Sequence, residues 1–236
     1  MNEAIDLFIT GGFRTLRDLS RAFRDYDNFY GHLLGDDTDK RVLDIGCGTG
    51  IFLKYLIKKG FVDVSGIDAS REMIAFCKNE DSMQVEHVTD LVQYLLSREA
   101  HYDFIFLNDV IEHFPKESVL ENLQAIYGAL KVNGQVVIKT GNTATLAGFY
   151  LRYKDFTHEH GFTEYSLRQV LMVSGYQDVA LTGNKIQFQW RPKRIIRLLG
   201  NKLILLFYRF YYTFHYGEGK PTIYSKLLIA TARKRP

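Results

Sequence analysis

The sequence predicts an α/β fold in which helices cover both faces of a mostly parallel sheet. Short apolar runs rich in β-branched and aromatic residues alternate with helical patterns, which is typical of successive βαβ units. A glycine-rich turn directly follows the first apolar run, at residues 46–50. The chain of 236 residues is long enough for one buried core, and 46% hydrophobic with 24% charged residues is an ordinary globular balance. We therefore expect a single α/β domain with additions.

The apolar runs predict seven strands, and 3.6-residue periodicity predicts the helices between them. The expected strands are Arg41–Ile45, Val62–Ile67, Met83–Val88, Tyr102–Leu107, Gln135–Thr140, Gln177–Leu181 and Ile223–Ala232. The helices expected within the βαβ region are Ile51–Lys59, Ser70–Asn79, Leu91–Ser97 and Glu117–Leu130. Ser70 is a predicted N-cap, and the Asn133-Gly134 pair predicts the turn into the fifth strand.

Segments outside this pattern define the predicted domain organisation. Residues 14–34 carry apolar residues partly on one face of a helix, which we expect to cover the sheet or a ligand. The organisation that we predict is an N-terminal helical cap at 1–37, a main domain at 38–190 with 221–236, and an insertion at 191–220.

Composition and charge disfavour several classes of protein. The formal net charge of +3 is too small to imply nucleic acid by itself, so no nucleic-acid partner is expected. Cys47 and Cys77 lack CxxC spacing and make no disulfide framework, which favours a cytoplasmic location. The N-terminus lacks the basic start and long apolar stretch of a signal peptide. No segment offers the run of about 18 uncharged apolar residues that a transmembrane span needs.

The strongest local signal is VLDIGCGTG at 42–50, where an apolar strand runs into glycines and then a helix. Glycine lets the backbone approach a ligand closely, and ligands of open parallel sheets bind at the carboxyl ends of strands. Asp68, which ends the second strand, is placed to accept hydrogen bonds from two ribose hydroxyls. The alternative is a tight glycine turn that binds nothing.

A dinucleotide site is disfavoured by the same residues. The pyrophosphate pattern is GxGxxG, whereas here the third glycine comes one residue early and Ile51 follows it. Asp44 is ill suited to a pyrophosphate but can receive an ammonium group. The implied ligand has an amine and a ribose and lacks phosphate.

DIGCGTG at 44–50, the acidic end of the second strand and LNDVIEH at 107–113 resemble the class I S-adenosylmethionine-dependent methyltransferases. The resemblance covers residues 38–183 and the last strand. It implies a Rossmann-like, seven-stranded, mostly parallel sheet with an antiparallel last strand, and S-adenosyl-L-methionine as the cofactor. The resemblance implies Asp44, Gly46 and Gly48 at the methionine end, Asp68 at the ribose, Thr89, Asp90 and Leu91 at the adenine, and Asn108 beside the sulfonium. Cys47, Gly50 and Ala69 are further cofactor-binding residues that it implies. Thr89 and Asp90 are equally well explained as a helix N-cap.

Methyl transfer needs the acceptor lone pair in line with the S–CH₃ bond, so orientation can contribute on the order of 7 to 11 kcal/mol. The (D/N)PP(Y/F) motif of nucleobase and glutamine-amide methyltransferases is absent, which disfavours that substrate class. Asp109, Glu112 and His113 instead resemble in spacing the metal-holding residues of quinone O-methyltransferases, and on a helical turn they would share one face. A divalent metal is the less favoured interpretation. With or without it, neutral His113 is expected near the methyl group, where it could take a hydroxyl proton.

The connection at 141–161 leads to a helix at 163–174 that Gly175 ends, and connections this long are usually functional. Residues 152–167 resemble the acceptor-side segment of bacterial methyltransferases associated with polysaccharide and glycolipid synthesis. The substrate-binding residues that this implies are Arg152, Tyr153, Asp155 and His160. His158 is a second candidate base beside His113, and Asp109 is a further candidate catalytic residue. The alternative is a solvated loop capped at Thr163 and Glu164.

Basic and apolar residues fall on different sides of a helix in the insertion, which suits either an anionic bilayer surface at 191–216 or a lid or homodimer face. The function expected overall is an O-methyltransferase acting on a sugar hydroxyl or phosphate oxygen of a surface glycan, glycolipid or related metabolite. A quinone or small-aromatic O-methyltransferase is one alternative. A catalytically silent binding module that uses the late basic cluster is the other.

Overall fold

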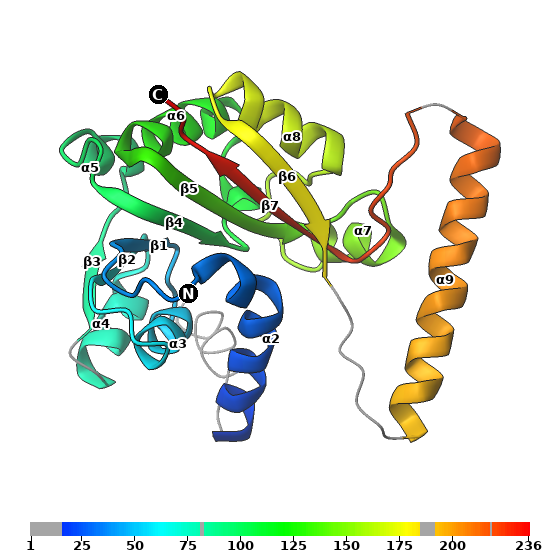
Figure 1. Ribbon diagram of the computed structural model, residues 1–236, viewed down its shortest axis with the longest axis horizontal. Coiled ribbons are helices and arrows are strands. Elements are labelled where there is room, and N and C mark those ends of the chain that lie inside the picture. The colour runs from blue at the N-terminus through cyan, green and yellow to red at the C-terminus, as the bar shows by residue number, and fades with distance from the viewer. Residues whose placement is uncertain (1–15, 81–82, 185–191, 218) are drawn as a thin grey trace.

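The computed structural model describes residues 16–80, 83–184, 192–217 and 219–236, and Figure 1 shows a central sheet with helices on both faces. The strands are β1 (Val42–Ile45), β2 (Val64–Asp68), β3 (Gln84–His87), β4 (Tyr102–Asn108), β5 (Leu130–Gly141), β6 (Gln177–Gly183) and β7 (Leu227–Arg233). The α-helices are α2 (Leu16–Leu34), α3 (Ile51–Lys58), α4 (Arg71–Glu80), α5 (Leu91–Leu96), α6 (Val119–Ala129), α7 (Leu146–Tyr153), α8 (Glu164–Val173) and α9 (Pro192–Tyr216). Two 3-10 turns, η1 (Ile111–His113) and η2 (Lys116–Ser118), follow β4.

The seven strands form one sheet in the order β3-β2-β1-β4-β5-β7-β6. Strands β1 to β5 pair in parallel, and β7 runs antiparallel to both β5 and β6. The strand order reverses at β1, so β1 and β4 flank the switch point where an open α/β sheet binds ligands. The predicted Rossmann-like fold, with its mostly parallel sheet and antiparallel last strand, is confirmed.

Alternate residues of the strands face two separate hydrophobic cores. In β1, Leu43 packs in the core shared with α5, α6 and α8, whereas Val42 packs in the core shared with α2, α3 and α4. Strand β4 repeats the alternation with Ile105 and Phe106, both fully buried. Because both faces are covered there, β1 and β4 are mostly apolar, and each buried large side chain contributes about 1.5–3 kcal/mol. The two layers fix the strand ends that surround the site.

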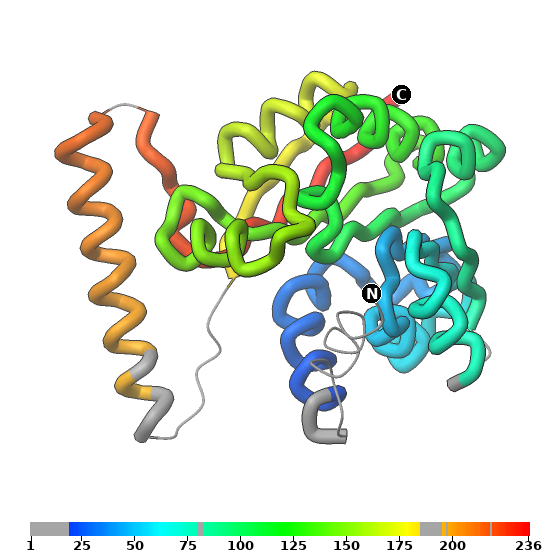
Figure 2. The backbone as a smooth tube through the Cα atoms, turned by 180° about the vertical axis from the view of Figure 1, so that it is seen from behind, coloured from blue at the N-terminus to red at the C-terminus, as the bar shows by residue number. Residues whose placement is uncertain are grey.

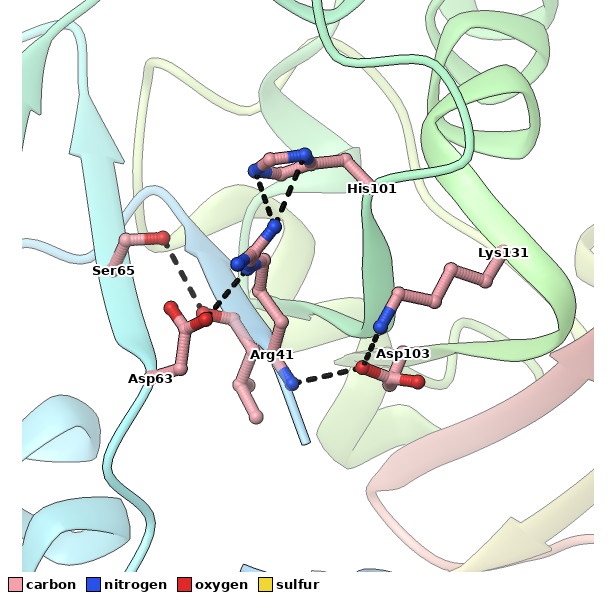
Figure 3. Close-up of polar contacts among 7 residues, drawn as sticks. Arg41, Asp63, Ser65, His101, Asp103 and Lys131 are labelled. Carbon is pink, nitrogen blue, oxygen red and sulfur yellow. Dashed lines mark hydrogen bonds and ion pairs between the residues drawn. The ribbon is translucent and has the colours of Figure 1, made fainter. Parts of the chain in front are cut away.

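The amino ends of the central strands are joined by polar side chains, at the edge of the sheet away from the glycine turn (Figure 3). Arg41 donates from Nε to Asp63 at 2.6 Å, and its backbone N–H donates to Asp103 at 2.9 Å. Lys131 also donates to Asp103, at 2.6 Å, and the ring of His101 lies 3.0 Å from the guanidinium. These groups are partly exposed, and exposed ion pairs contribute only about 0–1 kcal/mol each. Their main effect is to align the strands.

The long connection after β5 contains a helix that the sequence did not predict. Thr145 caps α7 by accepting a hydrogen bond from the N–H of Gly148 at 3.1 Å. A Cβ on Gly148 would lie 1.6 Å from the carbonyl oxygen of Asn142, so only glycine lets α7 sit this close to the end of β5. Gly148 has a low helix propensity, so the sequence of this segment does not indicate a helix, yet its missing side chain is what allows α7 to pack against the end of β5.

The last strand begins at Leu227, later than the predicted Ile223. The backbone before it bonds to side chains instead of to the sheet. Asn142 Nδ2 donates to the carbonyl oxygens of Ile223 and Ser225, at 2.8 and 2.9 Å. The carboxylate of Glu164 accepts from the N–H of Ile223 at 2.7 Å. The alternating pattern of apolar residues therefore begins before Leu227, where the pairing of β7 with its neighbouring strands begins.

The insertion forms the single long helix α9, which stands beside the sheet next to α7 in both views (Figures 1 and 2). It leaves from the end of β6 and returns to the start of β7, and these neighbouring strands pair directly at Gly183 and Leu228. No helix in the described part of the chain is long and apolar enough to cross a membrane.

Asn142 gives a test of how the connection is held. Its side chain is fully buried and also accepts from the N–H of Ala144, so alanine would remove three hydrogen bonds. We expect Asn142→Ala to lower the free energy of unfolding by about 2–4 kcal/mol in urea denaturation. Asn79→Ala, at an exposed position of α4, should change it by no more than about 0.5 kcal/mol. Equal losses in the two variants would contradict this account.

Candidate functional site

A cleft of about 1120 Å³ opens at the carboxyl ends of β1, β2 and β4. Nine of the residues predicted from the sequence line it: Gly46, Gly48, Asp68, Ala69, Thr89, Asp90, Leu91, Asp109 and His113. The structure therefore brings together the glycine turn, the acidic strand end and the segment after β4. The other predicted residues lie behind this surface or beside it.

The glycine turn after β1 forms the floor of the cleft. Gly46, Gly48 and Gly50 all have positive φ angles, 70°, 51° and 73°. A Cβ on Gly46 would lie 2.4 Å from a methyl group of Val110. A side chain at Gly46 would thus be strained twice, by its dihedral angle and by collision. Cys47 is buried beneath the turn and, like Gly50, does not line the cleft.

Asp68 ties the glycine turn to the start of α4. Its two carboxylate oxygens accept hydrogen bonds from the backbone N–H groups of Gly48 and Ser70, each at 2.8 Å. A carboxylate oxygen has a second lone pair, so both oxygens can still accept from hydroxyl groups in the cleft. This geometry suits the predicted pair of ribose hydroxyls.

The far end of the cleft combines an apolar wall with one acidic residue. Met73, Val88 and Leu91 line it, and an adenine ring would fit against such side chains. Asp90 caps α5, since its Oδ1 accepts from the N–H of Gln93 at 2.9 Å. The N-cap interpretation of Asp90 is therefore confirmed, and a contact with adenine remains compatible with it.

Asp44 and Asn108 are joined behind the glycine turn. Asn108 Nδ2 donates to Asp44 at 3.3 Å, and Asn108 Oδ1 accepts from the hydroxyl of Tyr30, on α2. Asp44 is only 2% exposed, and burial raises its pKa to about 8. Neither residue lines the cleft, so their contact with a methionine group or sulfonium remains a prediction. Tyr30, fully buried, was not singled out by the sequence analysis, although its helix was expected to cover the sheet or a ligand.

The three residues considered as metal ligands do not converge. Asp109 has a φ of 58° and precedes the 3-10 turn η1, so the predicted helical face shared with Glu112 and His113 is wrong. Asp109 pairs with Lys139, while buried Glu112 accepts from the hydroxyl of Thr140 at 2.9 Å. Burial raises the pKa of Glu112 to about 7. Among the described residues no cluster of three or more His, Cys, Asp or Glu could hold a metal ion.

His113 lines the cleft and is oriented from behind by a polar chain. Its Nδ1 lies 3.1 Å from Thr157 Oγ1 and 3.3 Å from the Thr157 carbonyl oxygen, and Thr157 Oγ1 donates to Asp155 at 2.7 Å. With Nδ1 protonated and donating to Thr157, Nε2 has a free lone pair. Burial, and then the neighbouring His158, lower the pKa of His113, so the neutral base form dominates at neutral pH.

The remaining predicted residues lie one layer back from the cleft. His158 meets the His113 ring at 4.7 Å between centroids and faces the Arg152 carbonyl oxygen at 3.2 Å through Nδ1. Arg152 donates to the carbonyl oxygen of Glu159 at 2.7 Å, and Tyr153 is exposed on α7. His160 is beside a small second cavity, where both of its ring nitrogens are buried without a hydrogen-bond partner.

Thr157 was not identified from the sequence, although it lies inside the 152–167 segment. It lines the cleft and contacts His113 across 44 positions of the chain, a separation that no local pattern reveals.

The charge of the cleft selects its ligands. Its described lining contains four carboxylates and no Lys or Arg, the carboxylates being Asp68, Asp90, Asp109 and Glu121. A pyrophosphate or other anionic group would meet repulsion here, whereas a sulfonium or an ammonium would be attracted. The residues present therefore fit an adenosyl cofactor that carries positive charge and lacks phosphate.

A methyltransferase-domain family model matches residues 16–181. That span is more than half of the chain and includes the glycine turn, Asp68 and His113. The protein therefore belongs to this family and is a class I S-adenosylmethionine-dependent methyltransferase.

Relatives with assigned names match about half of the chain. The ubiquinone biosynthesis O-methyltransferase of Neisseria meningitidis serogroup C is 28% identical over 138 residues, which is 56% of this chain and 56% of that protein. The protein of the same name from Citrobacter koseri is 31% identical over 107 residues, 44% of this chain and 43% of that protein. The matches thus span about half the length of these curated relatives.

Solved structures agree with the fold over most of the chain. A methyltransferase from Archaeoglobus fulgidus has a TM-score of 0.64 at 24% identity, covering 92% of each chain. Phosphoethanolamine N-methyltransferase 2 from Haemonchus contortus, in complex with S-adenosyl-L-methionine, has a TM-score of 0.56 at 18% identity, covering 94% of this chain and 59% of that one. At these identities the likeness concerns the fold alone.

Asp68 should be the largest single contributor to cofactor binding. Asp68→Ala removes hydrogen bonds to a charged acceptor, each contributing about 1.5–3 kcal/mol, and frees the glycine turn. We expect S-adenosylhomocysteine affinity in isothermal titration to fall roughly 10- to 100-fold or more. Asp63→Ala, before the other end of β2, is the matched control and should bind as the wild type does. An unchanged affinity for Asp68→Ala would remove this residue from the site.

Proposed function

We propose that the protein is an O-methyltransferase that transfers the methyl group of S-adenosylmethionine to a neutral hydroxyl group, with His113 as the general base. The observation that carries the proposal is the position of His113, which lines the cofactor cleft while Thr157 and Asp155 orient its ring. The bound cofactor would supply the methyl group. His113 would accept the hydroxyl proton on Nε2 as the oxygen becomes nucleophilic.

The acidic cleft favours a hydroxyl over a phosphate oxygen as the acceptor. An anionic phosphate would approach the carboxylate of Asp109 without a lining Lys or Arg among the described residues. Asp155 would stabilise the imidazolium that forms on His113, because its charge acts through Thr157 at the far side of the ring. His158, in ring contact with His113, lowers the pKa of His113 and so favours its neutral form before proton transfer.

Two classes of neutral acceptor have specific support. The 152–167 segment, which resembles the acceptor-side segment of polysaccharide- and glycolipid-associated methyltransferases, favours the hydroxyl of a glycan or glycolipid, and its Thr157 lines the cleft. A quinol or other phenol is the second candidate, because Val110, Phe114 and Pro115 give the cleft an apolar wall beside His113. The relatives named ubiquinone biosynthesis O-methyltransferase favour this candidate too.

Acceptor panels distinguish these candidates from a catalytically silent protein. S-adenosylhomocysteine release would be followed with hydroquinones and catechols, with neutral glycosides, and with their phosphorylated counterparts. Turnover of a neutral hydroxyl compound that is lost in His113→Gln would support the proposal. Cofactor binding without turnover of any compound, or turnover of the phosphorylated compounds alone, would contradict it.

The lowered pKa of His113 predicts the pH dependence of the reaction. Because the neutral imidazole is the base, kcat/KM should fall only as the pH drops through the His113 pKa, which lies below the ordinary value of about 6.5. His113→Gln should lose about 10²–10⁴-fold in rate together with this acidic limb. The pH profile of kcat/KM measures both effects.

Two further variants make the assignment specific. Glu112→Gln can still accept from Thr140, so it should keep the acidic limb even though Glu112 itself has a pKa of about 7. Asp155→Asn removes a charge that raises the His113 pKa, so its limb should move to lower pH. If the acidic limb of the kcat/KM profile disappeared in Glu112→Gln but persisted in His113→Gln, the general base would be Glu112 and the assignment to His113 would be wrong.

Chelators should leave the reaction unchanged. Asp109 and Glu112 are engaged by Lys139 and Thr140 and do not meet His113 in a shared coordination site. We expect the same kcat in EDTA as in added Mg²⁺. Loss of activity in EDTA that Mg²⁺ restores would show that the ligands rearrange around a metal.

A further inference from the structure

Two tyrosines on one side of helix α9 attach it to the connection after β5, and Thr213 accepts a hydrogen bond from Lys220, just beyond the helix, at 3.2 Å. Leu146 N–H donates to the hydroxyl oxygen of Tyr208 at 2.7 Å, and the Tyr212 hydroxyl donates to the Ala144 carbonyl oxygen at 2.6 Å. Both tyrosine rings stack on Tyr224, with centroids 6.2 and 5.8 Å apart. Because Tyr208 and Tyr212 are one turn apart, they define the side of α9 that faces the protein.

The opposite side of α9 is an apolar ridge. Its residues are Ile196, Leu203, Leu206, Phe207, Phe210 and Phe214, each more than half exposed. At 100° per residue, these six positions centre about half a turn of the helix away from Tyr208 and Tyr212. A monomeric protein rarely presents so continuous an apolar surface to water without a partner for it.

The charges of α9 identify the partner. Residues 192–216 include five Lys or Arg and no Asp or Glu. Lys202 and Arg209 are exposed, and their helical positions place them along one border of the ridge. A second copy of the helix would bring like charges together, whereas anionic lipid headgroups would neutralise them. Aromatic and aliphatic side chains bordered by cations are the composition of helices that lie in a membrane interface.

Exposed apolar side chains also extend from α7 toward the cleft. Phe149, Tyr150 and Tyr153 on α7 are all more than half exposed, and Phe156 is fully exposed. Phe156 directly precedes Thr157, which lines the cleft. An apolar surface therefore lies next to the site as well as on α9, and the two helices are neighbours in both views (Figures 1 and 2).

We propose that α9 docks on an anionic bilayer surface, with its apolar ridge at the boundary between headgroups and acyl chains and with Lys202 and Arg209 on lipid phosphates. Docking itself requires no catalysis. If the protein is the proposed O-methyltransferase, docking also implies that the hydroxyl acceptor is carried by a lipid and is reached from the membrane surface. This second point rests on the proposed function.

Vesicle flotation tests the docking directly. The full chain would be mixed with phosphatidylcholine vesicles, with or without phosphatidylglycerol, and we expect it to float with the anionic vesicles and to be released by salt. Leu203→Ser/Phe207→Ser/Phe210→Ser and Lys202→Glu/Arg209→Glu should each reduce the bound fraction at least roughly tenfold. The matched controls are Leu96→Ser on α5 and Lys78→Glu on α4, both exposed positions, which should bind as the wild type does.

Isothermal titration of S-adenosylhomocysteine shows that each variant is folded, because the substitutions lie away from the cleft. It also separates this proposal from the proposed function, since turnover of a soluble acceptor should persist in the α9 variants. A wild-type chain that stays with the unbound fraction, or α9 variants that still float, would overturn the docking. So would a wild-type dimer in light scattering that the ridge substitutions dissociate, because the ridge would then be a contact between two copies.

Discussion

The carboxylate of Asp68 holds together the two loops that form the cofactor edge of the sheet. Strand β2 delivers it beside the glycine turn, where it accepts from N–H groups on both the turn and the start of α4. Those N–H groups have no partner within a helix or strand, and leaving them buried and unpaired would cost about 1–3 kcal/mol each. One ionised side chain thus satisfies the backbone, fixes the glycine conformations and keeps lone pairs directed at a ligand.

The same edge of the sheet selects cationic over anionic ligands because the charged side chains that line its cleft are all acidic among the described residues. Four carboxylates line the cleft in the described part of the chain, and one of them, Asp109, is paired with Lys139. A positively charged cofactor lowers the cost of concentrating these carboxylates, and a neutral imidazole can remain neutral beside that cofactor. The exclusion of phosphate follows from this charge distribution. The pKa of His113 is lowered for another reason, because burial and His158 outweigh the carboxylates of Asp155 and Asp109, which raise it.

Local patterns predicted most of the fold. The apolar runs of β1 and β4, the glycine turn and the acid ending β2 each depend on neighbouring residues, and the structure has all of them. The contacts that were missed join distant residues: Tyr30 reaches Asn108 across 78 positions, and Thr157 reaches His113 across 44. Helix α7 was not predicted because Gly148, which its packing requires, is a residue of low helix propensity. The shared helical face expected for Asp109, Glu112 and His113 failed because Asp109 takes a left-handed dihedral angle.

Strands β6 and β7 are antiparallel neighbours that already pair at Gly183 and Leu228, next to the point where the chain departs into α9. A tight turn could join them there, since two-residue connections suffice for adjacent antiparallel strands. Helix α9 is thus an insertion between two strands that already pair with each other. If α9 docks on membranes as proposed, exchange of this insertion would change the surface at which the enzyme works while the strands that carry the cofactor cleft keep their order.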